Sequence, residues 1–242
     1  VYDLYTKAVP DREIVHAHAN AIAPDEVAQF ALDEEHLPAK VHRLLLELLE
    51  LGDNLSALGD VVGLRHKECA QLVGFSRAEV AANGWLHYPA LCSLAQVAPL
   101  AMTQLAFLAR CKSLNELIQR VPQDYLTQVL TAAGCTDKEL KNFGGRLKRI
   151  QALFVLVDGL RRNGDSVASF AGSAEAFDWR AQNDAMAALF VNYDLRQADA
   201  HDLGGEWRRR LEELGFDTAQ LNDGYGQALD FVFDRVVNSL AA

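Results

Sequence analysis

The stretch 190–202, FVNYDLRQADAHD, contains an arginine and a histidine five positions apart. Histidine titrates near neutral pH, so His201 could move a proton to or from a ribose 2′-hydroxyl or a leaving oxygen. Arg196 keeps its charge and could hold two phosphate oxygens while negative charge develops in a transition state. RNA supplies its own nucleophile, the 2′-hydroxyl, so this chemistry needs no metal ion. The pair therefore predicts metal-independent cleavage of a phosphodiester.

The spacing of the pair predicts an assembly as well. Helix positions five apart point about 140° away from each other and lie roughly 7.5 Å apart along the axis. One helix therefore does not aim Arg196 and His201 at a single point. A two-fold dimer that places the helix beside its copy would bring both pairs into one shared groove. We expect a homodimer in which this helix lines a groove between the protomers.

The neighbours of the pair have supporting roles or ordinary ones. Asp199 lies three residues after Arg196, and it either forms an ordinary ion pair within the helix or orients the arginine and tunes His201. Asn192 and Tyr193 are interpreted as supporting residues, with Tyr193 packing and its hydroxyl at the rim. Two further acids are interpreted as solvated: Asp194 and Asp202.

The segment LRQADAH, read as R-x4-H, resembles the signature of the HEPN superfamily. The resemblance implies an all-helical domain and a dimeric, metal-independent ribonuclease of a toxin–antitoxin or phage-defence system. It implies that Arg196 and His201 of both copies form the catalytic site. The polar residue that follows the arginine in this family is usually Asn, Asp or His, and here it is Gln197. One subgroup carries a tyrosine two residues after the histidine, where this chain has Leu203, so a nucleotide-transferring partner is not expected.

The resemblance divides the chain into two parts. Residues 86–242 are expected to form the HEPN-like helical domain, and residues 1–85 an N-terminal helical region of unknown role. The predicted function is that of an endoribonuclease of bacterial defence or a toxin–antitoxin system, with an RNA substrate and an antitoxin or regulatory partner. The alternative is a non-catalytic helical module for interaction or dimerisation. A third possibility is a helix-turn-helix regulator that uses residues 66–82.

Charge and composition restrict the partners. The net charge is −10, which argues against binding to duplex DNA through a broad basic surface. Basic residues nevertheless cluster in the C-terminal half, either as solvated helix faces or as a functional surface. These clusters are Arg146, Lys148 and Arg149; Arg161 and Arg162; and Arg208 to Arg210.

No motif in the sequence predicts a cofactor, a metal or a membrane span. The four cysteines form no CxxC pair, so neither a zinc site nor a disulfide framework is expected, and a reduced cytoplasmic protein fits. His16 and His18 lack further ligands at suitable spacing and are interpreted as part of a surface segment. No apolar run reaches transmembrane length, and no signal peptide is visible.

Hydrophobic periodicity predicts an all-α fold, a multi-helix bundle, because Ala and Leu recur at helical spacing along most of the chain. A helix is expected over 24–37. Leucines on more than one face of residues 38–58 predict a well-buried helix. Short helices separated by glycines are expected over 60–85. Pro99 should bend or divide a long apolar helix over 89–111.

Two capping-box patterns predict helix starts further along the chain. Ser113 is followed three residues later by Glu116, and Thr136 by Glu139. The pair Gly144-Gly145 is expected to break the helical pattern that follows Thr136.

The helix that carries Arg196 is expected to be capped by Ser173 and to stop near Gly204-Gly205. Two further helical segments are expected after it, over 206–214 and 217–240.

Overall fold

The computed structural model describes residues 35–163, 178–198 and 206–242. The described residues from Leu37 onward belong to one compact unit. The cap at Ser173, the stop at Gly204-Gly205 and most of the helix expected over 24–37 lie outside the described residues; Glu35 and His36 are not helical, and Leu37 begins the next helix.

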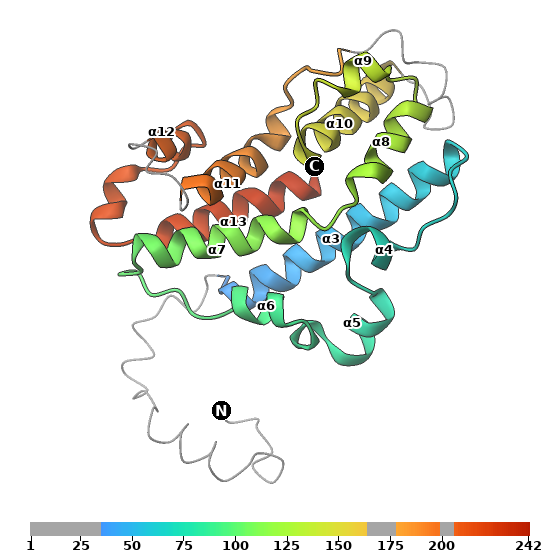
Figure 1. Ribbon diagram of the computed structural model, residues 1–242. Helices are drawn as coiled ribbons and strands as arrows, with labels where there is room; N and C mark the ends of the chain where they lie inside the picture. The colour runs from blue at the N-terminus through green and yellow to red at the C-terminus, as the bar shows by residue number, and fades with distance from the viewer. Residues whose placement is uncertain (1–34, 164–177, 199–205) are drawn as a thin grey trace. The chain divides into compact units, whose positions relative to one another are not determined.

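Within the described ranges every regular element is a helix, which confirms the all-α prediction. Four long helices pack together as the central bundle, and α11 lies along both α7 and α13 (Figure 1). These helices are α3 (Leu37–Val61), α7 (Gln104–Ile118), α11 (Ala187–Ala198) and α13 (Gly226–Ala241). The resemblance of the C-terminal part to the HEPN fold stays a prediction.

Helix α3 is buried on more than one face, as its leucines predict. Its one fully enclosed charge is the ammonium group of Lys40, whose residue is only 3% exposed. The Nζ atom lies 2.8 Å from Asp230 and 2.6 Å from Asp234, both on α13. Burial opposes the charge, but the two carboxylates outweigh it and raise the pKa of Lys40 above its ordinary value. The ion pairs therefore connect α3 to α13 through a charge that stays in place at neutral pH.

The chain between α3 and α7 forms short helices, and glycines separate those over 60–85, as predicted. These elements are α4 (Cys69–Val73), α5 (Arg77–Asn83), the 3-10 turn η2 (Trp85–His87) and α6 (Pro89–Leu94). Gly74 follows α4 with φ +76° and Gly84 follows α5 with φ +69°, a backbone region that other residues rarely adopt. Glycine is therefore needed where each of these helices turns.

Pro99 divides the apolar stretch 89–111 into two helices, because residues 95–103 between α6 and α7 are not helical. Main-chain hydrogen bonds attach this connection to the start of α13: Tyr225 N donates to Met102 O at 3.0 Å, and Gly226 N to Leu100 O at 3.2 Å. A Cβ atom on Gly226 would lie 2.5 Å from Pro99 O. The connection is thus held by backbone contacts that require a glycine.

The two capping-box predictions have different outcomes. Thr136 and Glu139 form the predicted box at the start of α9 (Asp137–Leu140). The prediction at Ser113 is wrong, because Ser113 lies inside α7 and its hydroxyl donates to Ala109 O at 3.1 Å. A serine hydroxyl that bonds the carbonyl four residues earlier no longer acts as a cap. Helix α7 begins instead after Thr103, whose side chain accepts from Ala106 N.

Helices α8 (Gln123–Ala132) and α10 (Arg146–Asn163) pack together beside the bundle. Gly144-Gly145 falls between α9 and α10, as predicted. Helix α12 (Glu206–Glu213) matches the helix expected over 206–214, while the 3-10 turn η6 (Thr218–Asn222) and α13 share the segment 217–240.

The start of α11 corrects the sequence prediction of a helix that begins at Ser173. Residues 178–183 are not helical, and a 3-10 turn η5 (Asp184–Met186) leads into α11 at Ala187. The Asn183 side chain accepts from Ala185 N at 3.0 Å and caps this turn. None of the described helices is long and apolar enough to cross a bilayer.

Candidate functional site

Helix α11 presents three different faces. One face is buried in the bundle, and it consists of Ala188, Leu189, Asn192 and Leu195. A second lines a groove, and it consists of Ala187, Phe190, Val191 and Asp194. The third is partly exposed and contains Tyr193, Arg196 and Gln197. The predicted site residues on α11 are therefore divided between the faces.

The third face brings three of the predicted residues together. The guanidinium carbon of Arg196 lies 5.1 Å from the centroid of the Tyr193 ring, within cation–π range. The Gln197 amide donates to the Tyr193 hydroxyl at 3.1 Å, which fixes the ring from its other end. Among the described residues, no carboxylate lies within ion-pair distance of Arg196. The arginine therefore offers a positioned and partly exposed cation.

Asn192 lies on the buried face and has no exposed surface. Neither side-chain atom of its amide has a hydrogen-bond partner among the described residues, and the same holds for the equally buried Asn115 on α7. A buried amide without a partner typically costs about 1–3 kcal/mol. Because Asn192 does not reach the surface, it can support the residues of the third face only through packing.

The other half of the predicted pair lies outside the described residues. His201, Asp199 and Asp202 belong to the segment 199–205, so the approach of Arg196 to His201 and the ion pair with Asp199 stay predictions.

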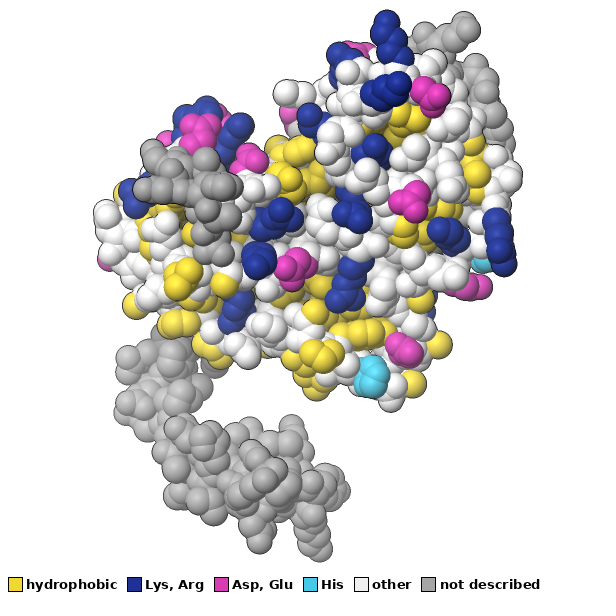
Figure 2. All heavy atoms as spheres, viewed as in Figure 1, with side chains coloured by type: hydrophobic (Ala, Val, Ile, Leu, Met, Phe, Trp, Pro, Cys, Tyr) yellow, Lys and Arg dark blue, Asp and Glu magenta, His cyan; other side chains and the backbone are white. Residues whose placement is uncertain are grey.

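A groove of about 690 Å³ lies between α10, the segment before α11, α11 itself and α12. Its basic side chains are Lys148, Arg180 and Arg210. Its acidic side chains are Asp184, Asp194 and Glu213, and four amide side chains and the aromatic Phe143, Trp179 and Phe190 also line it. The molecular outline in Figure 2 is indented between α12 and the region of α9 and α10. Arg196 does not line this groove, although it shares α11 with Asp194.

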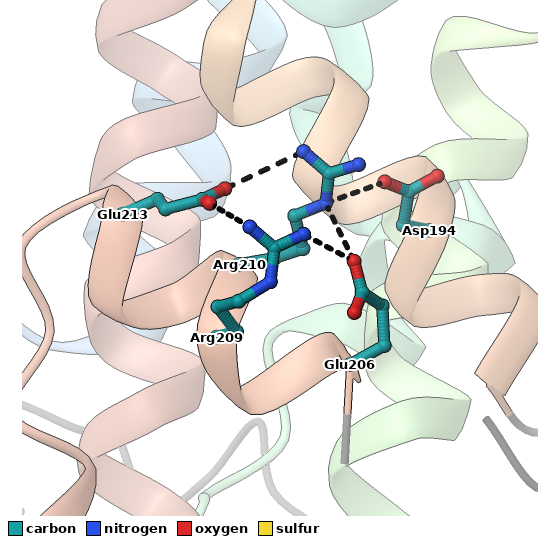
Figure 3. A network of polar contacts seen from close by, with 5 residues as sticks. All are labelled: Asp194, Glu206, Arg209, Arg210 and Glu213. Atoms are coloured by element: carbon teal, nitrogen blue, oxygen red, sulfur yellow. Dashed lines mark hydrogen bonds and ion pairs between the residues drawn. The ribbon is translucent and has the colours of Figure 1, made fainter. Parts of the chain in front are cut away.

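A network of ion pairs forms the α12 side of the groove (Figure 3). Arg209 pairs with Glu206 and Glu213 along α12, and Arg210 Nη1 lies 3.4 Å from Glu213. Arg210 also reaches α11, where its Nε lies 3.7 Å from Asp194 Oδ2. The network therefore attaches α12 to α11.

Asp194 was predicted to be solvated, and its side chain is 42% exposed. Burial of the rest raises its pKa above the ordinary value, while the charge of Arg210 opposes this shift. Arg210 Nε is buried and makes no hydrogen bond to any described residue. Asp194 therefore neutralises part of the arginine's charge at the groove.

The basic clusters separate into structural and exposed residues. The Arg146 guanidinium donates to Val121 O at 2.8 Å, and that of buried Arg149 to Phe143 O at 2.9 Å. Arg162 pairs with Asp158 on its own helix. Lys148 is exposed at the groove instead. Figure 2 shows basic side chains spread more widely than acidic ones over the face in view, although the chain as a whole is acidic.

The structure describes some of the potential metal ligands and all four cysteines of the chain. The described residues contain no group of three or more His, Cys, Asp or Glu placed to hold a metal ion. The four cysteines are free thiols. Burial is the main cause that raises the pKa of Cys69 to about 11, so this thiol stays protonated at neutral pH. His16 and His18 lie outside the described residues.

Four large apolar side chains in the segment 86–105, before and after α6, are exposed. These are Leu86, Val97, Leu100 and Leu105, which are 65–86% exposed, and together they are called the apolar patch below. The main-chain hydrogen bonds to Tyr225 and Gly226 hold part of this patch in place. Large exposed apolar side chains are typical of an interaction site where they form one surface.

Comparisons of this chain with protein-family models, with curated proteins and with solved structures found no match. The assignment of a function therefore depends on the residues themselves.

Sequence reasoning did not find the groove. Lys148 was noted as part of a basic cluster, but Trp179 and Arg180 were not singled out. The segment DWRAQND, 178–184, carries the available signal, since it combines an aromatic residue, charges and amides directly before a helix.

Proposed function

We propose that the protein is a metal-independent endoribonuclease in which Arg196 binds the scissile phosphate and His201 acts as general acid and base. The observation that supports this proposal best is the partly exposed Arg196 guanidinium, which no described carboxylate neutralises. A guanidinium that is free of carboxylates can bind two phosphate oxygens and stabilise the charge that develops on them.

Tyr193 and Gln197 position the arginine in this proposal. The ring of Tyr193 lies under the guanidinium, and the Gln197 amide holds the tyrosine hydroxyl. An arginine held this way loses little conformational freedom when a phosphate binds, so more of the interaction energy is available to the transition state.

The resemblance of LRQADAH to the HEPN signature supports the biological setting. We propose a role in bacterial defence or in a toxin–antitoxin pair, in the cytoplasm, with an antitoxin or regulatory partner that controls cleavage. The helix-turn-helix interpretation of residues 66–82 has no comparable support from a positioned cation.

The test is an RNA cleavage assay in EDTA with the full chain. Arg196→Ala and His201→Ala should each reduce cleavage at least about 100-fold, as removal of a group that stabilises the transition state does. Arg196→Lys should restore little, because an ammonium does not hold two oxygens in a planar fork. Arg161→Ala, an exposed arginine on α10, is the matched control and should cleave normally.

The proposal would be abandoned if either alanine variant kept its activity, or if cleavage required added divalent metal. Arg196 is partly exposed, so Arg196→Ala is expected to fold normally. Circular dichroism spectra that match the wild type would show that both alanine variants are folded.

A second copy of the chain is the proposed occupant of the apolar patch. Sedimentation should give twice the chain mass of 26.6 kDa for the wild type and the monomer mass for Val97→Glu with Leu105→Glu. This double variant should also cleave RNA more slowly than the wild type, because each copy in the dimer contributes residues to the shared site. Leu46→Glu with Val61→Glu changes two exposed apolar residues of α3 and should leave the dimer intact. If the wild type sedimented as a monomer and still cleaved RNA, the proposed dimer would be wrong.

The apolar patch also favours the second candidate, a non-catalytic interaction module. In that case the chain would dimerise through the patch and would not cleave RNA under any condition of the assay. The two measurements together therefore separate the candidates.

A further inference from the structure

The groove between α10, α11 and α12 has no role in the chemistry assigned to Arg196 and His201. Its volume of about 690 Å³ lies within the few hundred to one thousand Å³ typical of ligand pockets. Its walls come from parts of the chain that are far apart in sequence, and the ion-pair network between Asp194 and Arg210 connects two of them. It is therefore a formed feature of the fold.

The charges along the groove leave two cations unpaired. Asp194 and Glu213 both interact with Arg210, and Glu213 also pairs with Arg209, so both carboxylates already have cationic partners. Lys148 and Arg180 are exposed and form no ion pair with any residue in the described ranges. Arg180 lies close enough to Glu139 to contribute to the lowered pKa of that carboxyl, whose main cause is the Thr136 hydroxyl. Asp184, the remaining acid, is exposed to solvent.

Two amide side chains of the groove each have one polar atom without a hydrogen-bond partner among the described residues. The Gln151 amide nitrogen donates to Ala181 O at 3.1 Å, while its carbonyl oxygen has no partner among the described residues. The carbonyl oxygen of Asn183 accepts from Ala185 N, while its amide nitrogen has none. Free donors and acceptors close to one another suit the edges of unpaired bases. Phe190 adds a partly exposed aromatic ring.

We propose that this groove binds a segment of single-stranded RNA, with phosphates on Lys148 and Arg180 and a base stacked on Phe190. This inference rests on the proposed ribonuclease function and adds to it a substrate-binding surface on the same helix. Phe190 and Asp194 face the groove, while Arg196 lies on the neighbouring face of α11. A strand that occupies the groove would therefore pass close to the proposed catalytic arginine.

The test measures binding separately from cleavage. A fluorescent single-stranded oligonucleotide of about a dozen residues with 2′-O-methyl riboses is the probe, since it lacks the nucleophile and is not cleaved. Fluorescence anisotropy is measured with the full chain at several salt concentrations. Lys148→Gln with Arg180→Gln should weaken binding at least tenfold at low salt. It should also reduce the slope of log affinity against log salt by about 1.4, since each lost phosphate contact on a single strand contributes about 0.7.

The control keeps the same change of charge. Lys112→Gln with Arg161→Gln removes two exposed cations on α7 and α10 that do not line the groove, and should bind as the wild type does. Phe190→Leu keeps an apolar side chain and removes the aromatic face. It should weaken binding about fivefold or more, as loss of base stacking does.

The outcomes separate this inference from the proposed function. If the wild type binds the probe and the groove variant binds as well as the control, the groove assignment is wrong while cleavage by Arg196 and His201 can stand. If the probe binds through the groove and RNA is never cleaved, the groove assignment stands without the ribonuclease. If a free mononucleotide at equal concentration displaced the probe completely, the proposed RNA strand would be wrong and the groove would be a nucleotide-binding site. Absence of probe binding would overturn the inference.

Discussion

Gly59→Ala is expected to lower the free energy of unfolding by about 2–3 kcal/mol. Gly59 lies inside α3, where a Cβ atom would fall on the hydroxyl oxygen of Tyr125, with the ring carbon Cζ 3.0 Å away. Tyr125 is fully buried, and its hydroxyl donates to Leu55 O at 2.9 Å. The ring cannot move away without losing this hydrogen bond and disturbing the core around it.

Helix propensity alone predicts the opposite result. Alanine is favoured over glycine inside a helix by about 1 kcal/mol, so a site with free space would be stabilised. Gly144→Ala is the control for a glycine with free space: Gly144 lies between α9 and α10, nothing lies within 4 Å of a Cβ atom built there, and the substitution should change the stability little. Urea denaturation followed by circular dichroism measures both variants.

Tyr125→Phe provides a second control, since it removes the oxygen that the new methyl group meets. Combined with Gly59→Ala it should recover part of the lost stability, which a double-mutant cycle would detect as coupling. A stabilised Gly59→Ala variant would show that the contact between α3 and Tyr125 is looser than described.

Asn192→Asp is expected to lower the stability at neutral pH by about 3–5 kcal/mol, the typical result of an uncompensated buried charge. The substitution hardly changes the size of the side chain, but it places a carboxylate on the buried face of α11. Burial raises the pKa of such a carboxyl in the folded state above its value in the unfolded chain. The folded state therefore takes up the proton first as the pH falls, and the loss of stability should shrink between pH 7 and about pH 4.

A second substitution at the same buried position is expected to have the opposite effect on stability. Asn192→Leu removes an amide that has no partner among the described residues and should keep or raise the midpoint of thermal unfolding. Asn54→Asp makes the same charge change at an exposed position of α3 and should have little effect. If Asn192→Asp were as stable as the wild type at pH 7, water or a hydrogen-bond partner would have to reach this amide.

The sequence predicted most of the helices because strong local signals determine them. The leucines of α3, the division at Pro99 and the glycines after α4 and α5 are signals of this kind. The capping box illustrates the limit of such signals. Thr136 follows a turn at Gly134, and its box forms, whereas Ser113 follows a helical run without a breaker and is absorbed into α7.

The candidate site could be predicted only where its residues are close in sequence. Tyr193, Arg196 and Gln197 lie within two turns of one helix, and they meet as a periodic pattern requires. The groove combines α10, the segment 178–186, α11 and α12, so its shape depends on tertiary packing. The burial of Asn192 was not predictable either, because an asparagine among polar neighbours resembles surface sequence.

The ion pairs of Lys40 have a consequence for the newly made chain. Lys40 and Asp234 are 194 positions apart, so α3 has to wait for its partner helix during translation. At about 5–20 residues per second this delay lasts on the order of ten seconds or more. During that time the leucine-rich surface of α3 lacks its final cover and is available to a chaperone. Because α11 also packs on α13, the face that carries Arg196 is completed late in synthesis, and an unfinished chain would lack the assembled bundle.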